Sequence, residues 1–272
     1  MAIDIFSMNT LLVLNLFLVP LLIGGITLAA RRWGPAVGGL LSAFPVISAP
    51  ILFFIALRHG QTFAADAALG TLSAVPANAV FAIFYAWCAT RTPWIPSLAA
   101  GFAGYFLAVS CMNFWSPSLP VAIAFVICTL LIAPRLFPTM ISAAEAKTAS
   151  TSDIYWRMAA GAILVLFVTQ SSAALGPRLS GSFAMFPVLA PVLAVFSHRQ
   201  SGPAFAIQLL RGMAMGYYVF TTFCVVLSLT LPVTGIGSAF LLSLGSAVAA
   251  QVISHFCLRS TRQTSSPPVT ER

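Results

Sequence analysis

Four prolines in two related apolar spans, Pro45 and Pro50 in one and Pro187 and Pro191 in the other, are the residues best suited to build a binding site. Residues 34–47 read GPAVGGLLSAFPVI and residues 176–189 read GPRLSGSFAMFPVL, with six of fourteen positions identical in an ungapped alignment. A proline inside a helix removes one backbone donor and frees the carbonyl four residues earlier. In a membrane, such carbonyls are tolerated where they are buried or line a cavity. The prolines therefore predict a cavity between two broken helices.

Polar and aromatic side chains beside these prolines complete the predicted site. Pro45 is expected to free the carbonyl of Leu41, with serine hydroxyls nearby and two phenylalanines as apolar walls. Asn78 follows Pro76 in a neighbouring apolar run. The predicted substrate-binding residues are Ser42, Phe44, Pro45, Ser48, Asn78, Ser182, Phe186 and Pro187. In the structural alternative, which stays open, the prolines only kink their helices.

Two charged residues are candidates for energy coupling. Asp66 is the only carboxylate expected within an apolar span, and Arg211 lies within another. An ionisable group inside a bilayer is a functional candidate by default. Asp66 also suits an interfacial capping role near a helix start, and Arg211 could extend towards the interface. Their predicted depths are too different for a direct ion pair.

The composition requires these residues to be positioned by membrane-spanning helices. Of 272 residues, 60% are hydrophobic and 7% are charged, whereas about a quarter are charged in soluble domains. A soluble globular protein is therefore excluded. The net charge of +8 is spread thinly, without the basic stripe that nucleic-acid binding needs. We expect an all-α, polytopic integral membrane protein.

The pattern of reactive residues argues against an enzyme. The five cysteines stand singly, and the three histidines are far apart in the sequence. Neither set has metal-ligand spacing, and there is no P-loop. We therefore expect no catalytic residue, no metal, no cofactor and no direct use of ATP.

Runs without charged residues predict nine transmembrane helices, because about 20 apolar residues make one crossing. Two runs are long enough for two crossings each and are divided at positions 113–120 (NFWSPSLP) and 231–237 (LPVTGIG). Gly212 and Gly216 have a GxxxG spacing that predicts close helix packing. The expected helices lie near residues 10–30, 36–57, 63–90, 95–113, 118–136, 157–175, 179–197, 203–231 and 235–258.

The distribution of basic residues predicts the orientation. With the N-terminus outside, two basic residues, Arg58 and Arg178, face outwards. Ten face the cytoplasm, namely Arg31, Arg32, Arg91, Arg135, Lys147, Arg157, Arg199, Arg259, Arg262 and Arg272. We therefore expect a multi-pass protein of the plasma (bacterial inner) membrane, with its N-terminus outside and its C-terminus in the cytoplasm.

The motif copies divide the chain into two halves. Residues 1–141 form the first repeat of about five helices, and residues 157–258 form the second of about four. Residues 142–156 are a polar cytoplasmic linker and residues 259–272 a disordered cytoplasmic tail, because neither can bury enough apolar surface. The copies begin at helices two and seven, five crossings apart, so they run in opposite directions. This architecture resembles the broad group of inverted-repeat carriers with broken helices.

These observations predict a secondary transporter or facilitator for a small polar or anionic solute, with its site between the halves. The expected partners are the lipid bilayer and the solute, without nucleic acid. Sodium, a proton or no coupling ion stay open, as does a homo-oligomer. A non-catalytic subunit of a larger permease and, less favoured, a membrane-embedded lipid-modifying enzyme remain alternatives.

Overall fold

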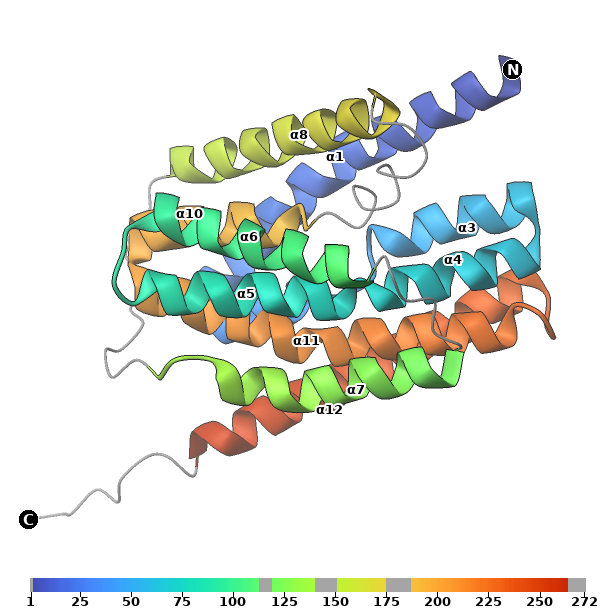
Figure 1. The fold of residues 1–272 in the computed structure, drawn as a ribbon. Coiled ribbons are helices and arrows are strands. Elements are labelled where there is room, and N and C mark those ends of the chain that lie inside the picture. Colours follow the sequence, from blue (N-terminus) through green and yellow to red (C-terminus); the bar gives the residue numbers. More distant parts are fainter. Residues whose placement is uncertain (1, 113–118, 140–150, 175–186, 264–272) are drawn as a thin grey trace, which may run out of the picture.

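The chain is all-helical in the part that the structure describes. This structure, a computed structural model, describes residues 2–112, 119–139, 151–174 and 187–263 (Figure 1). Within those ranges there are helices and no strand. The helices are α1 Ala2–Trp33, α2 Pro35–Ser42, α3 Ser48–His59, α4 Gln61–Ser73, α5 Val75–Ala89, α6 Trp94–Met112, α7 Leu119–Leu136, α8 Thr151–Ala174, α10 Leu189–Ser201, α11 Pro203–Thr230 and α12 Ile236–Gln263.

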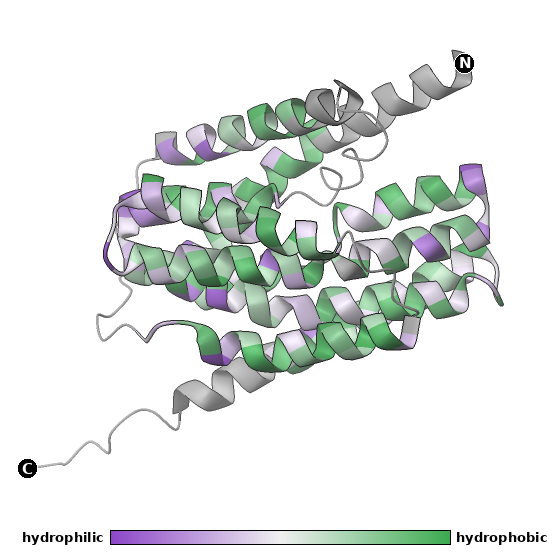
Figure 2. Cartoon of the chain, viewed as in Figure 1, coloured by the Kyte–Doolittle hydropathy of each residue, from purple (hydrophilic) through white to green (hydrophobic). Residues whose placement is uncertain are grey.

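The surface of the helical bundle is compatible with membrane insertion. Five helical stretches are long and apolar enough to cross a membrane, namely Leu16–Trp33, Gln61–Ala89, Trp94–Met112, Pro203–Thr230 and Ile236–Ser254. Large apolar side chains such as Leu107, Leu131 and Leu241 are exposed on the outer helices. Figure 2 shows most hydrophilic residues gathered towards the two ends of the bundle. An exposed apolar surface this large is unusual for a soluble monomer.

Helix α11 forms the centre of the bundle and packs against α2, α4, α5, α10 and α12. Its contact with α2 is between backbones, because glycines remove the side chains that would separate them. A Cβ atom on Gly212 would meet the backbone of Ala36, and one on Gly216 would meet Leu40 and Ala43. The close packing predicted from the GxxxG spacing is therefore confirmed.

The first proline-containing span is broken where the sequence predicts. Helix α2 ends at Ser42 and α3 begins at Ser48, with Pro45 in the break between them. The expected free carbonyl at Leu41 is wrong, because Phe44 N–H donates to it at 3.2 Å. Pro50 does not kink a helix either. It is the third residue of α3, in the first turn, where backbone N–H groups have no intrahelical partner.

The described part of the second proline-containing span resembles the first at the start of its helix. Helix α10 begins at Leu189, directly after Pro187 and Val188. Pro191 is the third residue of α10, so it takes the same place in the first turn as Pro50 takes in α3. The motif residues before Pro187 lie outside the described residues.

Two helices extend into segments that composition assigns to the linker and the tail. Helix α8 begins at Thr151, so residues 151–156 of the expected linker are helical. Helix α12 continues to Gln263, five residues into the expected tail. The remainder of both segments lies outside the described residues.

Two turns built on glycine have the same backbone geometry. Gly60 joins α3 to α4 with φ 87° and ψ 171°, and Gly202 joins α10 to α11 with φ 87° and ψ 174°. In each turn the glycine N–H donates at 3.1 Å to the carbonyl four residues earlier, that of Ala56 or His198. Residues with a Cβ atom rarely adopt this conformation. We use each glycine to name the segment formed by its two flanking helices. The Gly60 turn is residues 48–73 (α3 and α4), and the Gly202 turn is residues 189–230 (α10 and α11).

Candidate functional site

The predicted site residues of the first span surround the break between α2 and α3. Ser42 and Pro45 are buried, whereas Phe44 and Ser48 are half-buried. The Ser42 hydroxyl donates to the carbonyl of Gly39 at 2.6 Å, so its hydrogen atom is already used within α2. These four residues lie within or beside the break between α2 and α3, and their role in binding stays a prediction.

The second half of the predicted site is described only in part. Pro187 is buried, while Ser182 and Phe186 lie outside the described residues. The meeting of the two breaks at one site therefore stays a prediction. Asn78, on α5, is half-buried, and its Oδ1 atom has no hydrogen-bond partner among the described residues. It retains an acceptor for a ligand.

The coupling candidates are exposed and lie near opposite ends of the bundle. Asp66 is on α4, six residues after Gly60, and Arg211 is on α11, nine residues after Gly202. Both are exposed. They form no ion pair with each other in the described chain, in agreement with the predicted difference in depth.

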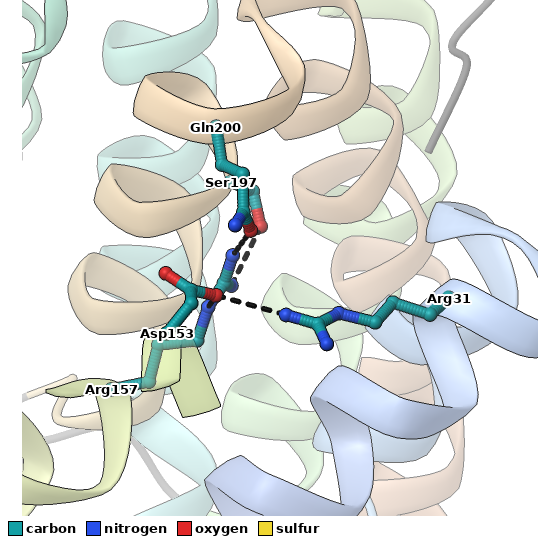
Figure 3. Close-up of polar contacts among 5 residues, drawn as sticks. All are labelled: Arg31, Asp153, Arg157, Ser197 and Gln200. Atoms are coloured by element: carbon teal, nitrogen blue, oxygen red, sulfur yellow. Dashed lines mark hydrogen bonds and ion pairs between the residues drawn. The ribbon is translucent and has the colours of Figure 1, made fainter. Parts of the chain in front are cut away.

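A partly buried charged cluster lies at the C-terminal end of α10, the helix that Gly202 follows (Figure 3). Arg157 Nε donates to Asp153 Oδ2 at 2.7 Å, and Arg31 Nη2 donates to the same oxygen at 3.0 Å. Arg157 Nη1 donates to Ser197 Oγ at 3.2 Å and Arg157 Nη2 to Gln200 Oε1 at 2.9 Å. We call these five residues the Arg157 cluster. It joins α1, α8 and α10.

Helical spacing places the members of the cluster. Asp153 and Arg157 are four residues apart in the first turns of α8, so they share one face. Ser197 and Gln200 are three residues apart near the end of α10 and share a face for the same reason. Arg31 is in the last turn of α1. The cluster therefore forms because α1 and α10 end where α8 begins.

Burial makes Arg157 the central residue of the cluster. Its side chain is 4% exposed, compared with 23% for Arg31 and 16% for Asp153. A buried guanidinium loses its hydration, and this cost must be offset by hydrogen bonds and opposite charge. Arg157 obtains three hydrogen bonds, and its guanidinium also lies 5.5 Å from the ring centre of Phe196. Such a cation–π contact adds further stabilisation.

A small cavity adjoins the cluster. It is lined by Thr27, Ala30, Arg31, Arg157, Leu193, Ser197, Gln200, Ser201, Phe205 and Leu209. Its volume of about 10 Å³ is roughly that needed by one water molecule. Thr27 is 3% exposed, and its hydroxyl oxygen has no partner among the described residues. Thr27 precedes Arg31 by one helical turn, so both face the cavity that we call the Arg157 cavity.

A second buried polar contact lies beside the cluster. The Tyr85 hydroxyl is 3.2 Å from His198 Nδ1, and the two residues are 0% and 9% exposed. This contact joins α5, in the first half of the chain, to α10, in the second. The Gly202 turn is therefore held by polar contacts on two sides.

Sequence reasoning missed the Arg157 cluster. It placed Asp153 in the linker and used Arg31 and Arg157 only to orient the chain. The signal that could have found the cluster is the four-residue spacing of Asp153 and Arg157, which is typical of an ion pair on a helix.

No protein-family model, no curated protein and no solved structure matches this chain.

Proposed function

We propose that this protein is a secondary transporter or facilitator that moves a small polar or anionic solute across a bacterial inner membrane. In this proposal nine spans form two inverted repeats, and the solute binds between them and reaches each side in turn. The two broken spans are residues 35–59, formed by α2 and α3, and the span that ends with α10. Carriers with inverted repeats bind their solutes at broken helices of this kind.

The observation that carries the proposal is the equivalence of the Gly60 and Gly202 turns. The separation of Gly60 from Gly202 in the sequence equals that of Gly34 from Gly176, the first residues of the two motif copies. Each turn follows a half-helix of 12 or 13 residues and precedes a long helical segment. The same rare glycine conformation at equivalent positions supports a duplication independently of apolar sequence similarity.

The pairing of helices supports two-fold related halves. In the first half, the segment after Gly60 continues as α5, which packs against α6; in the second half, α11 packs against α12. Helix α1 packs against α8, the first described helix of the second half. A two-fold axis would exchange the first two pairs with each other and α1 with α8. Helix α7 has no counterpart among the described helices, as the five-plus-four division predicts.

The placement of basic residues supports the proposed orientation. Arg31 is in the last turn of α1, Arg135 in the last turn of α7, Arg157 in the second turn of α8 and Arg199 in the last turn of α10. These helix ends lie at the same end of the bundle in Figure 1. Arg58, at the end of α3, lies at the opposite end. An excess of basic residues marks the cytoplasmic side.

The experiment begins with a ligand search on the purified full chain. Thermal unfolding is measured with a panel of small metabolites, in sodium and in potassium buffers and at several pH values. Compounds that raise the melting temperature are then tested for counterflow in proteoliposomes that contain only this protein. We expect at least one polar or anionic compound to bind and to exchange across the membrane.

Two results would contradict the proposal. Binding without any flux through the purified chain would favour a non-catalytic permease subunit, which needs other chains for transport. Chemical conversion of the proteoliposome lipids would favour the lipid-modifying enzyme. Matched liposomes without protein serve as the control in both measurements.

A further inference from the structure

Tyr85 and His198 form a polar contact among apolar side chains. The Tyr85 hydroxyl is 3.2 Å from His198 Nδ1, and the two rings meet edge to face with their centres 6.0 Å apart. Both side chains are buried, and so are alanines within one helical turn of them, namely Ala82, Ala86 and Ala194. An ionisable side chain in such a place within a membrane protein is a candidate for function.

This contact joins the two halves of the chain at one end of the bundle. Helix α5 belongs to the first half and α10 to the second. His198 is in the last turn of α10, and its carbonyl accepts a hydrogen bond from Gly202 N–H. Carriers of the proposed kind open one end by moving one half against the other. Movement of α5 away from α10 would break the contact, so the contact helps to keep this end closed.

Few charged or titratable groups face the imidazole. Helix α10 packs against α1, α6, α8 and α11, and against α5 through Tyr85. The parts of α6 and α11 next to the end of α10, residues 94–104 and 203–210, contain no titratable side chain. The groups on the other elements are Tyr85 and Cys88 on α5, Arg31 on α1, and Asp153 and Arg157 on α8. The Asp153 carboxylate is bound to the two arginines, and no carboxylate in the described part of the chain is bonded to His198.

Protonation changes the free energy of burying this imidazole. A neutral imidazole has one N–H donor and one acceptor nitrogen, so it can share a hydrogen bond with the Tyr85 hydroxyl. An imidazolium ion is charged, and burying a charge without an ionic partner is costly. In water this cost disappears, and the last turn of a helix favours a cation. Protonation of His198 therefore favours an arrangement in which water reaches the imidazole.

The other copy of the repeat has no titratable group at the corresponding place. The sequence separation between the two turn glycines relates His198 to Ala56 and, in the other direction, Tyr85 to Leu227. Ala56 and Leu227 are both buried. Apolar side chains do not bind protons, so the two ends of the proposed carrier are expected to respond differently to pH.

We infer that His198 is a proton-binding site that controls access to one side of the proposed carrier. Its neutral imidazole, in contact with Tyr85, keeps this end of the bundle closed, and its protonation opens it. The proton comes from the water on that side and returns to it, so only one N–H bond forms and breaks. This inference rests on the proposed function, and in the proposed orientation the controlling pH is that of the cytoplasm.

The experiment measures the separation of the two halves by pulsed electron paramagnetic resonance. In a variant without native cysteines, Arg91→Cys after α5 and Arg199→Cys on α10 carry spin labels, because both positions are exposed. The full chain is placed in nanodiscs of zwitterionic lipid. A hydrated imidazole has a pKa of about 6.5. If only the open arrangement binds the proton, the ratio of long to short label distances should rise about tenfold between about pH 7.5 and about pH 5.5.

His198→Gln is the decisive variant. Glutamine keeps a hydrogen-bonding side chain that binds no proton in this pH range, so the label distances should not change with pH. His59→Gln is the matched control, because His59 is exposed in the last turn of α3, the corresponding half-helix. It should leave the pH response intact. A pH response that survives in His198→Gln would overturn the inference.

Tyr85→Phe keeps the test decisive if His198→Gln folds poorly. The variant removes the partner of the imidazole but leaves the proton-binding group. We therefore expect more open molecules at neutral pH and a pH response that persists. Asp153→Asn tests the other acidic group near this end of α10, and the pH response should persist there as well. Loss of the response in Asp153→Asn, or label distances unaffected by Tyr85→Phe, would overturn the inference.

Labels at the opposite end of the bundle provide a further control. Arg58→Cys and Val233→Cys are exposed positions there, and their separation should not depend on pH. A pH response at both ends would overturn the inference, because it would not originate at His198.

Flux measurements separate this inference from the proposed function. Separation of the labels at low pH without flux of any solute in proteoliposomes would keep the proton site and reject the transporter. Flux of a solute through a chain whose label distances do not depend on pH would keep the transporter and reject the proton site.

Discussion

The Gly60 and Gly202 turns share a backbone but are held by different forces. When the two turns are aligned on their glycines, Ser197 and His198 of the Gly202 turn correspond to Ile55 and Ala56 of the Gly60 turn. The Gly60 turn packs through aromatic rings, with Phe53 and Phe240 in an edge-to-face contact at 5.2 Å. The Gly202 turn packs through the Arg157 cluster and the Tyr85–His198 contact.

This difference shows that two segments with the same backbone geometry can be held in place by different kinds of contact. Apolar contacts are non-directional and roughly proportional to buried area, so the aromatic packing of the Gly60 turn tolerates small shifts. Its polar contact is weaker than those of the Gly202 turn, because it is a single uncharged hydrogen bond from Gln61 Nε2 to the Thr234 carbonyl at 3.1 Å. A charged, hydrogen-bonded contact requires defined geometry. The position of the Gly202 turn is therefore fixed more narrowly by its contacts than that of the Gly60 turn.

The largest expected effect concerns which side of the membrane each turn faces. In a variant without the five native cysteines, His59→Cys and Arg199→Cys place one reactive thiol beside each glycine. Both positions are exposed. We expect a membrane-impermeant reagent added to intact cells to label the cysteine at 59 and to spare the one at 199. Labelling of both from the same side would remove the inverted relation of the two turns.

The next prediction compares how much a buried arginine and an exposed arginine contribute to the free energy of unfolding. Arg157→Met removes the centre of the cluster, and we expect a loss of about 3–5 kcal/mol in the free energy of unfolding. Arg58→Met, at the end of α3, should change it by less than about 0.5 kcal/mol, because Arg58 is exposed. Denaturant unfolding in detergent measures both. Equal losses of stability in the two variants would contradict the difference between the Gly202 turn and the Gly60 turn.

The glycines themselves test the equivalence of the backbones. Gly60→Ala and Gly202→Ala should each cost about 1–3 kcal/mol of stability, because this conformation is restricted to glycine. No described atom lies within 4 Å of an added Cβ at either position, so strain is the only expected cost. Gly25→Ala on α1, also without a neighbour within 4 Å, is the control and should be neutral or stabilising. Thermal or denaturant unfolding measures all three, and a cost at only one turn would contradict their equivalence.

The smallest expected effect is that of Asp66→Asn. Asp66 is exposed on α4, so its replacement should change the free energy of unfolding by less than about 0.5 kcal/mol. We also expect the pH dependence of solute uptake to persist in this variant, which would place Asp66 outside the coupling machinery. Loss of pH-driven uptake with intact counterflow would instead establish Asp66 as the proton-coupling group.

Sequence reasoning succeeded for features that depend on neighbouring residues. Apolar runs predicted an all-helical chain, and Pro45 predicted the break between α2 and α3, because both follow from local backbone chemistry. The carbonyl of Leu41 was misjudged, since the break allows Phe44 N–H to fold back onto it. The partner of a carbonyl cannot be deduced from helical spacing once the chain leaves the helix.

The Arg157 cluster could not be predicted in full, because its residues come from three distant parts of the chain. The spacing of Asp153 and Arg157 is visible in the sequence. The approach of Arg31 and of Ser197 is set by how α1 and α10 pack against α8. Composition also gave no indication that Asp153 belongs to a helix, because its polar neighbours resemble those of a flexible linker.

The glycine seam between α2 and α11 has a consequence for biogenesis. Helix α2 has eight residues, or about 12 Å at 1.5 Å per residue, which is too short to cross a bilayer core by itself. Its backbone contact, through Gly39, is with Leu209 and Gly212 of a helix synthesised much later. At ordinary rates of translation this delay lasts roughly 10–30 s. During that time the nascent chain must keep α2 in or near the insertion machinery until α11 arrives.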